Sequence, residues 1–237
     1  SNFRQNWPEF VAAGYRVIGM DRVGSATGAA LPGVTTLQQD IRVFARETAE
    51  RAAAFAAIRA QLGTDGLSVL VNNAATQRLA PTDRITVEEV EDTLETNVVA
   101  PLMLVQGLLP ELERAGGSVV NIGSVHGTAT KREFVAYATS KAALAGLTRA
   151  LAVDLGGRVR VNNISPGAIA TPMLDAGFEG RAEARKQLDA VHPLGRVGTP
   201  MEVAQAALFL ASDAASNITG LDLRVDGGVA ARLHDPA

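Results

Sequence analysis

Short apolar runs alternate along this chain with longer segments that are rich in alanine and leucine. The run 67–71 is short and apolar, as expected for a strand that helices cover on both faces. No linker or repeat interrupts the alternation, which therefore predicts one α/β domain over residues 1–237, with a doubly wound, mainly parallel sheet flanked by helices. The predicted strands are residues 15–20, 34–41, 67–71, 118–122, 159–164 and 222–225.

Helix signals fall between these runs. The alanine-rich stretch 44–62 predicts one long helix. Two capping boxes, in which a threonine precedes a glutamate by three residues, predict where two further helices begin. They are formed by Thr86 with Glu89 and by Thr199 with Glu202.

The composition excludes several classes of protein. The 237 residues contain no cysteine, which excludes disulfides and thiolate metal sites. A net charge of -3 and a pI near 5.7 provide no basic surface for nucleic acid. No apolar run approaches the roughly 20 residues that span a bilayer, and the acidic run 88–92 is interpreted as a solvated helix face. We therefore expect a soluble, cytoplasmic protein that holds no metal and binds neither nucleic acid nor membrane.

A serine, a tyrosine and a lysine form the most informative chemical pattern. Ser124 follows the predicted strand 118–122, Tyr137 lies thirteen residues later, and Lys141 lies four residues after Tyr137. Tyr137 and Lys141 share one face of a predicted helix over 134–155. Because a nearby ammonium group favours a phenolate, we predict that Lys141 lowers the pKa of Tyr137 toward the range useful for proton transfer. Such a pair alone is more often a half-buried ring beside a solvated amine.

The combined pattern resembles the catalytic signature of the short-chain dehydrogenase/reductase family. The likeness extends over nearly the whole chain, and Asn97, twenty-seven residues before Ser124, has the spacing of the family's fourth catalytic residue. The resemblance implies a Rossmann-like fold and a hydride transfer between a nicotinamide cofactor and a secondary alcohol or ketone. Tyr137 would be the acid/base, and Lys141 would lower its pKa and hold the ribose. Ser124 would orient the carbonyl, and Asn97 would hold a water that completes a proton relay.

The resemblance also implies a dinucleotide site. Asp21 ends the predicted strand 15–20, where a carboxylate against the adenosine ribose favours NAD, whereas Arg22 could pair with the 2′-phosphate of NADP. We expect NAD, and NADP stays open as the alternative. Ala75 stands where the family pattern has a glycine. The implied cofactor-binding residues are Asp21, Arg22, Asp40, Ile41, Asn73, Ala74, Ala75, Tyr137, Lys141, Pro166, Gly167, Ile169 and Thr171.

The family's glycine-rich phosphate loop has no counterpart at the start of the sequence. Its last glycine should lie about eleven residues before the glycine that closes the first helix. Counting back from Gly14, that position is Phe3. Removing the central strand before the loop would leave its neighbours about 9 to 10 Å apart, with backbone groups unpaired. We therefore expect the natural molecule to carry further N-terminal residues. The alternative is a divergent member that has lost dinucleotide binding.

The resemblance implies a substrate lid over about 170–198, with glycine, proline and charged residues that suit a mobile loop containing short helices. Ser124, His126 and Tyr137 are expected to bind the substrate, although a position at the pocket rim fits His126 equally well. A sugar, a hydroxy acid, an acyl thioester and a steroid are all compatible substrates. The resemblance also implies assembly into a homo-oligomer, a tetramer or a dimer.

Two alternatives to a dehydrogenase stay open. One is a lyase or dehalogenase derived from the same family, which keeps the serine and tyrosine without binding a dinucleotide. Such enzymes typically carry arginine where this chain has Lys141. The other is a binding protein without catalytic activity, which the presence of all four catalytic positions disfavours.

Overall fold

A computed structural model describes residues 7–22 and 31–233 of the chain. Its strands are β1 (Val17–Asp21), β2 (Val34–Gln38), β3 (Val69–Asn72), β4 (Ser118–Ile122), β5 (Arg160–Pro166) and β6 (Asp222–Val225). Its α-helices are α1 (Trp7–Ala12), α2 (Ile41–Arg46), α3 (Thr48–Gln61), α4 (Val87–Leu94), α5 (Ala100–Arg114), α6 (Val135–Leu155), α7 (Pro172–Gly177), α8 (Ala182–Val191) and α9 (Pro200–Ala211). A π-helical turn, η2 (Glu95–Val99), joins α4 to α5, and 3-10 turns form at η3 (Val125–Gly127), η4 (Asp213–Ala215) and η5 (Val229–Ala231).

The described strands pair in parallel throughout. β1 pairs with β2, and β3, β4, β5 and β6 pair in that order. Within the described ranges no ladder joins these two groups, so the strands form a two-stranded and a four-stranded sheet. The predicted α/β architecture with parallel strands is confirmed. Because parallel strands end at the same edge of a sheet, the loops after them come together there.

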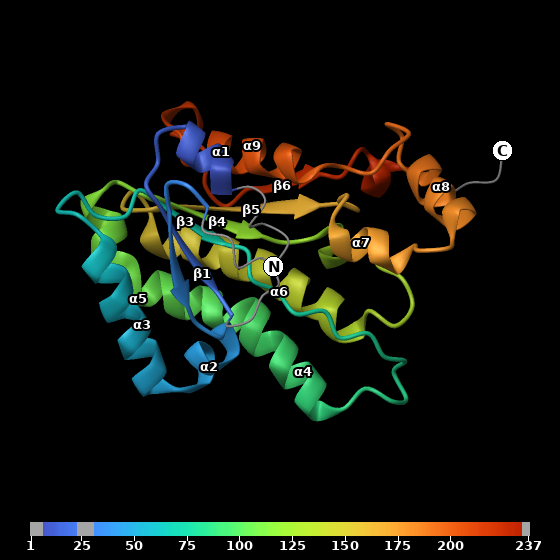
Figure 1. Cartoon of the computed structure of the whole chain (residues 1–237), viewed down its shortest axis with the longest axis horizontal. Helices are drawn as coiled ribbons and strands as arrows, with labels where there is room; N and C mark the ends of the chain where they lie inside the picture. The colour runs from blue at the N-terminus through green and yellow to red at the C-terminus, as the bar shows by residue number, and fades with distance from the viewer. Residues whose placement is uncertain (1–6, 23–30, 234–237) are drawn as a thin grey trace.

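Helices cover both faces of the sheet (Figure 1). α1 and α9 lie on one face, whereas α3, α5 and α6 lie on the other. α7 and α8 lie to one side, past the end of β5. The alternation of side chains along β4 explains how the strand serves both layers, since Val119 packs among residues of α5 and α6 and Val120 packs among residues of α9. No helix in the described parts of the chain is long and apolar enough to cross a bilayer.

Both predicted capping boxes are confirmed. The Thr86 hydroxyl accepts from the Glu89 amide at 3.2 Å, and the Glu89 carboxylate accepts from the Thr86 amide at 3.1 Å. Thr199 and Glu202 make the equivalent pair of bonds at the start of α9. Each box satisfies backbone donors that a helix start leaves unpaired, which is why α4 and α9 begin where the sequence predicts.

The single helix predicted over 44–62 is wrong, because two helices form there. Glu47 separates α2 from α3 with an extended backbone, at φ -98° and ψ 113°. The guanidinium of Arg51 donates to the carbonyls of Phe44 and Ala45 at 3.0 and 2.9 Å. A side chain from α3 thus satisfies the carboxyl end of α2, so the break leaves fewer carbonyls unpaired.

The strand predicted over 34–41 ends earlier, at Gln38. Asp40 is the N-cap of α2, because its carboxylate accepts from the Arg42 amide at 2.9 Å. Ile41 is therefore the first helical residue rather than the last strand residue. β1 likewise runs from Val17 to Asp21, shifted by one or two residues from the predicted 15–20.

Candidate active site

The structure brings the four predicted catalytic residues to the carboxyl edge of the sheet. Ser124 follows β4, Tyr137 and Lys141 lie in the first turns of α6, and Asn97 lies in η2. The contacts of α6 with η2 and η3 hold these elements together. Ser124, Lys141 and Asn97 are buried. The site thus combines a hydroxyl, a phenol, an ammonium and an amide in a region with little access to water.

Ser124 connects directly to Tyr137. The Ser124 hydroxyl accepts from the backbone amide of His126 at 3.2 Å and forms a hydrogen bond with the Tyr137 side chain. A serine hydroxyl has one donor and two acceptor positions. Because the His126 amide uses an acceptor position, the Ser124 proton stays available for the phenol oxygen or for a substrate oxygen.

The predicted effect of Lys141 on Tyr137 is wrong for this structure. Burial raises the pKa of Tyr137, and the hydrogen bond from Ser124 lowers it only in part. The Lys141 ammonium lies over the tyrosine ring, 5.6 Å from its centroid, and donates to the Ile122 carbonyl at 2.7 Å. In this geometry Ser124, rather than Lys141, is the group that favours the phenolate.

Lys141 is itself strongly perturbed. The residue is 3% exposed, and burial lowers the pKa of its ammonium to about 8. A lysine ammonium has three donors, and the described parts of the chain provide one acceptor, the Ile122 carbonyl. Two donors on a buried cation thus remain for another ligand.

Asn97 is held by its side chain and changes the helix around it. Its amide donates to the Thr76 carbonyl at 3.0 Å and to the Ser140 hydroxyl at 2.9 Å, and it accepts from the Thr76 amide at 2.8 Å. The π-helical turn widens the helix at this position. Pro101, four residues later, has no N–H, so the Asn97 carbonyl lacks its usual α-helical donor. The helix is therefore distorted at Asn97, where the π-helical turn meets the start of α5.

The acidic residues expected near the adenosine lie among arginines. Asp21 ends β1 and accepts from the Arg22 amide at 2.8 Å. Burial raises the pKa of Asp40, but hydrogen bonds and charge from Arg42 outweigh that effect and lower it. Arg42 lies 3.3 Å from the Asp40 carboxylate and 3.7 Å from that of Asp92.

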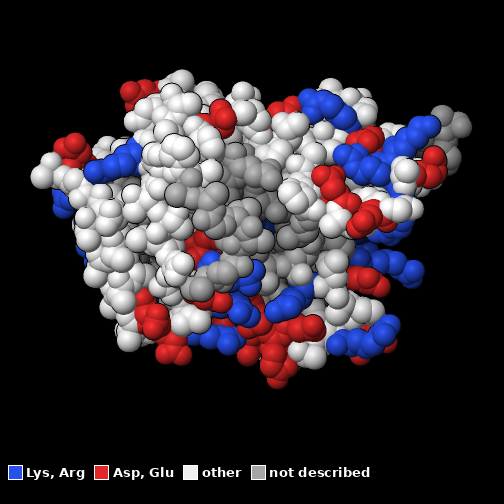
Figure 2. Space-filling view, in the orientation of Figure 1, with Lys and Arg blue, Asp and Glu red and all other residues white. Residues whose placement is uncertain are grey.

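Asp92 belongs to the run 88–92 that was predicted to be a solvated helix face, but its carboxylate forms several ion pairs. Besides Arg42, it contacts Arg46 at 3.0 Å and Arg78 at 3.6 Å. Three guanidinium groups, two from α2 and one from the loop after β3, thus share one carboxylate on α4. On the face drawn in Figure 2, acidic and basic side chains are interspersed along the lower edge rather than separated by sign. The described residues contain no group of three His, Cys, Asp or Glu that could hold a metal ion.

The remaining predicted cofactor residues follow β3 and β5. Asn73, Ala74 and Ala75 come directly after β3. At the end of β5, a Cβ on Gly167 would lie 3.0 Å from the Asp226 backbone, so the turn of Pro166 and Gly167 packs closely against that segment. Ile169 pairs with Gly198, and the Thr171 hydroxyl accepts from Leu174 at 3.2 Å to cap α7. These residues form one continuous edge with Ser124.

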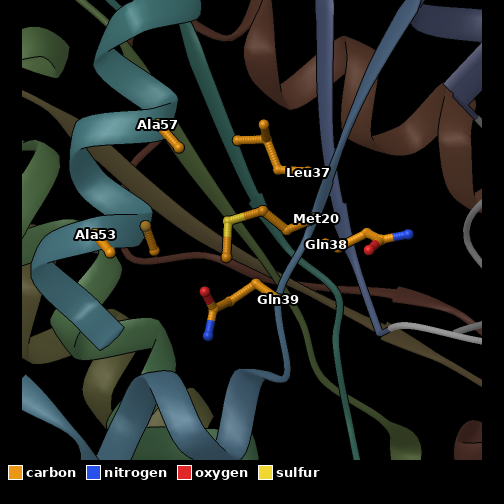
Figure 3. Close-up of a pocket in the computed structure, with 7 residues that line it drawn as sticks. Met20, Leu37, Gln38, Gln39, Ala53 and Ala57 are labelled. Carbon is orange, nitrogen blue, oxygen red and sulfur yellow. The ribbon is translucent and has the colours of Figure 1, made fainter. Parts of the chain in front are cut away.

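A separate pocket of about 200 Å³ lies between α3 and the β1–β2 pair (Figure 3). Met20 and Leu37 face Ala53 and Ala57 across it, with Gln39 at one side. None of the predicted catalytic residues lines this pocket. The chemistry of the candidate site therefore lies elsewhere, at the strand ends.

Sequence reasoning missed three residues of the site. Thr76 and Ser140 hold the Asn97 amide, and Phe134 packs against His126. Ser140 directly precedes Lys141, so one turn of α6 serves both the lysine and the asparagine. Pro101 was the available sequence signal for the distortion at Asn97, because a proline removes the donor four residues along a helix.

A parallel sheet covered by helices on both faces, with polar side chains gathered at the carboxyl ends of its strands, is the arrangement of Rossmann-like folds. Residues 8–230 match a family model described as enoyl-(acyl carrier protein) reductase. The chain belongs to the short-chain dehydrogenase/reductase family.

Individual relatives agree with this assignment. D-threitol dehydrogenase of Mycolicibacterium smegmatis is 39% identical over 193 residues, which cover 79% of this chain and 72% of that protein. Protein FixR of Bradyrhizobium diazoefficiens is 46% identical over 180 residues, which cover 72% of this chain but 62% of FixR, less than two thirds of its length. The ligand-free aldohexose dehydrogenase of Thermoplasma acidophilum superposes with a TM-score of 0.89 at 29% identity, covering 99% of this chain and 91% of that one.

Proposed function

We propose that this protein transfers a hydride between a nicotinamide cofactor and a secondary alcohol or ketone, with Tyr137 as the acid/base. The observation that carries the proposal is the chain of contacts from Ser124 to Tyr137, beside the buried ammonium of Lys141. In the oxidative direction Tyr137 takes the hydroxyl proton of the alcohol, and Ser124 donates to the oxygen as it becomes a carbonyl. A bound nicotinamide would supply the acceptor for the hydride that leaves the carbinol carbon.

The residues present fit such a cofactor. The two N–H donors of Lys141 that lack a described acceptor suit the hydroxyl groups of a ribose, and they lie in a buried region where an unpaired cation is costly. Asn97 would support a proton path, because Pro101 removes the N–H that a regular α-helix would direct at its backbone carbonyl. The residues that would hold the cofactor are Asp21, Asp40, Ile41, Asn73, Ala74, Ala75, Tyr137, Lys141, Pro166, Gly167, Ile169 and Thr171.

NAD is the proposed form of the cofactor. The Arg42 guanidinium pairs with the carboxylates of Asp40 and Asp92, and the charge of Arg22 acts on Asp40, whose pKa it helps to lower. Because these arginines are matched by carboxylates, the region offers a 2′-phosphate little uncompensated positive charge. NADP is the alternative form, through Arg22.

The segment 170–198 is the proposed substrate lid. It contains α7 and α8, and no described residue of α8 is buried. A helix that buries so little can move at low cost in packing energy, which suits a lid. Assembly into a dimer or tetramer and a cytoplasmic location stay predictions.

Substitution of Tyr137 tests the proposal. The Tyr137→Phe variant should lose at least about a hundredfold in turnover, the typical contribution of a general acid or base, while its circular dichroism stays unchanged. The assay follows NADH formation with a panel of secondary alcohols. Tyr15→Phe is the matched control, since Tyr15 is the chain's other tyrosine and packs on Phe10 away from the site. Turnover of Tyr137→Phe equal to that of the wild type would reject the assignment.

A further inference from the structure

The loop that follows Ser124 is held in place over the site. The Ala80 amide donates to the Glu133 carbonyl at 3.1 Å, and Ala80 forms a β-bridge with Phe134. Glu133 has φ 70°, the one positive value at a described residue other than glycine. Such a backbone conformation is strained for a residue with a side chain and persists only where the surroundings hold it. The position of Phe134, next along the chain, is thus imposed by contacts.

Phe134 and Thr130 in turn hold the ring of His126. The rings of Phe134 and His126 are stacked, with 4.3 Å between their centroids and 14° between their planes. The Tyr137 ring meets the imidazole edge to face at 5.9 Å. The Thr130 hydroxyl lies 2.9 Å from His126 Nδ1. The imidazole is therefore fixed by a stack, a neighbouring catalytic ring and one hydrogen bond.

Because the His126 imidazole is neutral, its tautomer decides which ring nitrogen can donate a hydrogen bond. Burial and the charge of Lys131 lower the pKa of His126, so the imidazole is neutral at pH 7. A neutral imidazole has one donor and one acceptor nitrogen, and the hydrogen bond at one nitrogen decides the role of the other. Among the described residues, the Thr130 hydroxyl has one hydrogen-bond partner, His126 Nδ1.

We propose that Thr130 is a positioning residue, whose hydroxyl donates to His126 Nδ1 and thereby presents Nε2–H to an oxygen of the substrate. The proposal rests on the function proposed above and deepens it. Nε2 has no partner among the described residues. A donor held beside the acid/base tyrosine favours substrates that carry a second oxygen near the reacting carbinol, such as polyols, over alcohols with a single oxygen.

Nitrogen NMR of the imidazole tests the tautomer without reference to activity. The chain has three histidines, and a His126→Asn variant assigns the signal of interest. Above the pKa of His126, the wild type should show an unprotonated Nδ1 and a protonated Nε2. Thr130→Val should lose that fixed tautomer, whereas Thr130→Ser should retain it. Thr128→Val is the matched control, because its hydroxyl bonds to the Val125 carbonyl at 3.2 Å in the same loop.

Kinetics with two alcohols test the role toward the substrate. With D-threitol, Thr130→Val should raise KM about tenfold and leave kcat within about threefold, equivalent to losing one oriented hydrogen bond. With cyclopentanol, which has one oxygen, its KM should change less than about twofold. General damage to the loop would raise both values.

Three results would overturn the proposal: a wild-type imidazole protonated on Nδ1, a Thr130→Val spectrum identical to that of the wild type, or equal KM values for Thr130→Val and Thr128→Val with D-threitol. If the wild type oxidises neither alcohol, the proposed function fails for these substrates, and the imidazole spectrum still decides the tautomer.

Discussion

The buried ammonium of Lys141 should lower the stability of the protein in the absence of a cofactor. Replacing Lys141 by methionine removes the charge while keeping a long apolar side chain of similar size. We expect Lys141→Met to abolish turnover and yet to unfold at a higher urea concentration than the wild type at pH 7. The reason is that burial of the charged form, which lowers the pKa to about 8, disfavours the folded state.

The size of the effect follows from the pKa. An ordinary lysine has a pKa of 10.5, so the shift to about 8 corresponds to about 3 kcal/mol below pH 8. The variant also leaves the Ile122 carbonyl unpaired, which costs about 1–3 kcal/mol. The net gain at pH 7 is therefore about 1 kcal/mol.

The pH dependence carries the sharper prediction. Between pH 8 and pH 10.5 the unfolded wild type binds a proton that the folded state has released, so its stability rises with pH. The variant lacks this rise. Its advantage should shrink by about 2 kcal/mol between pH 7 and pH 9.5 and reverse sign. Other titrating groups are common to both proteins and cancel in the difference.

Urea unfolding followed by circular dichroism at pH 7 and pH 9.5 measures both quantities. Lys186→Met is the matched control, because Lys186 lies exposed on α8 and its replacement should produce no pH-dependent difference. A difference between wild type and Lys141→Met that is the same at the two pH values would refute the reasoning, since the desolvated ammonium would then be absent.

Two further substitutions test other parts of the structure. Asp92→Asn should raise the ratio of kcat/KM with NADP to kcat/KM with NAD about fivefold, which corresponds to on the order of 1 kcal/mol, because three arginines lose their shared carboxylate. Glu113→Gln, which breaks a distant ion pair with Arg158, should leave that ratio unchanged. Gly107→Ala should lower the free energy of unfolding by about 1–3 kcal/mol, because an added Cβ would overlap the Phe55 ring. Gly146→Ala, whose added Cβ would meet the Arg149 guanidinium at an ordinary contact distance of 3.9 Å, should stabilise the protein by about 0.5–1 kcal/mol.

Features that depend on a few neighbouring residues were predictable from the sequence. The starts of α4 and α9 follow from threonine and glutamate three apart, since both bonds of a capping box form within one turn. The strands β4 and β6 were predicted with their observed bounds. The placement of Ser124 beyond β4, and of Tyr137 and Lys141 in α6, follows from the same local patterns.

Features that depend on long-range contacts were not predictable. The break at Glu47 has no glycine or proline to signal it, and it is accommodated by Arg51 bonding across the gap. The pKa of Tyr137 depends on where the Lys141 ammonium points, and a spacing of four residues defines a helix face but no direction within it. The sequence therefore predicted the pair of residues correctly and the sign of the pKa shift incorrectly.

Polar residues inside the strands show why the site edge is hard to recognise from hydrophobic patterns. Asn72, Asn121 and Asn163 occupy the same register position in β3, β4 and β5. Asn72 donates to Asn121 at 2.8 Å, and Asn121 donates to Thr148 on α6 at the same distance. All three asparagines are buried, and each is costly unless hydrogen-bonded. Along the sequence, each asparagine is a single polar residue next to apolar strand residues. In the sheet, the three are neighbours across the strands and form a polar row near the carboxyl edge. The row extends the polar surroundings of Lys141 into the sheet, so the buried polar side chains gather at the end of the sheet that carries the site.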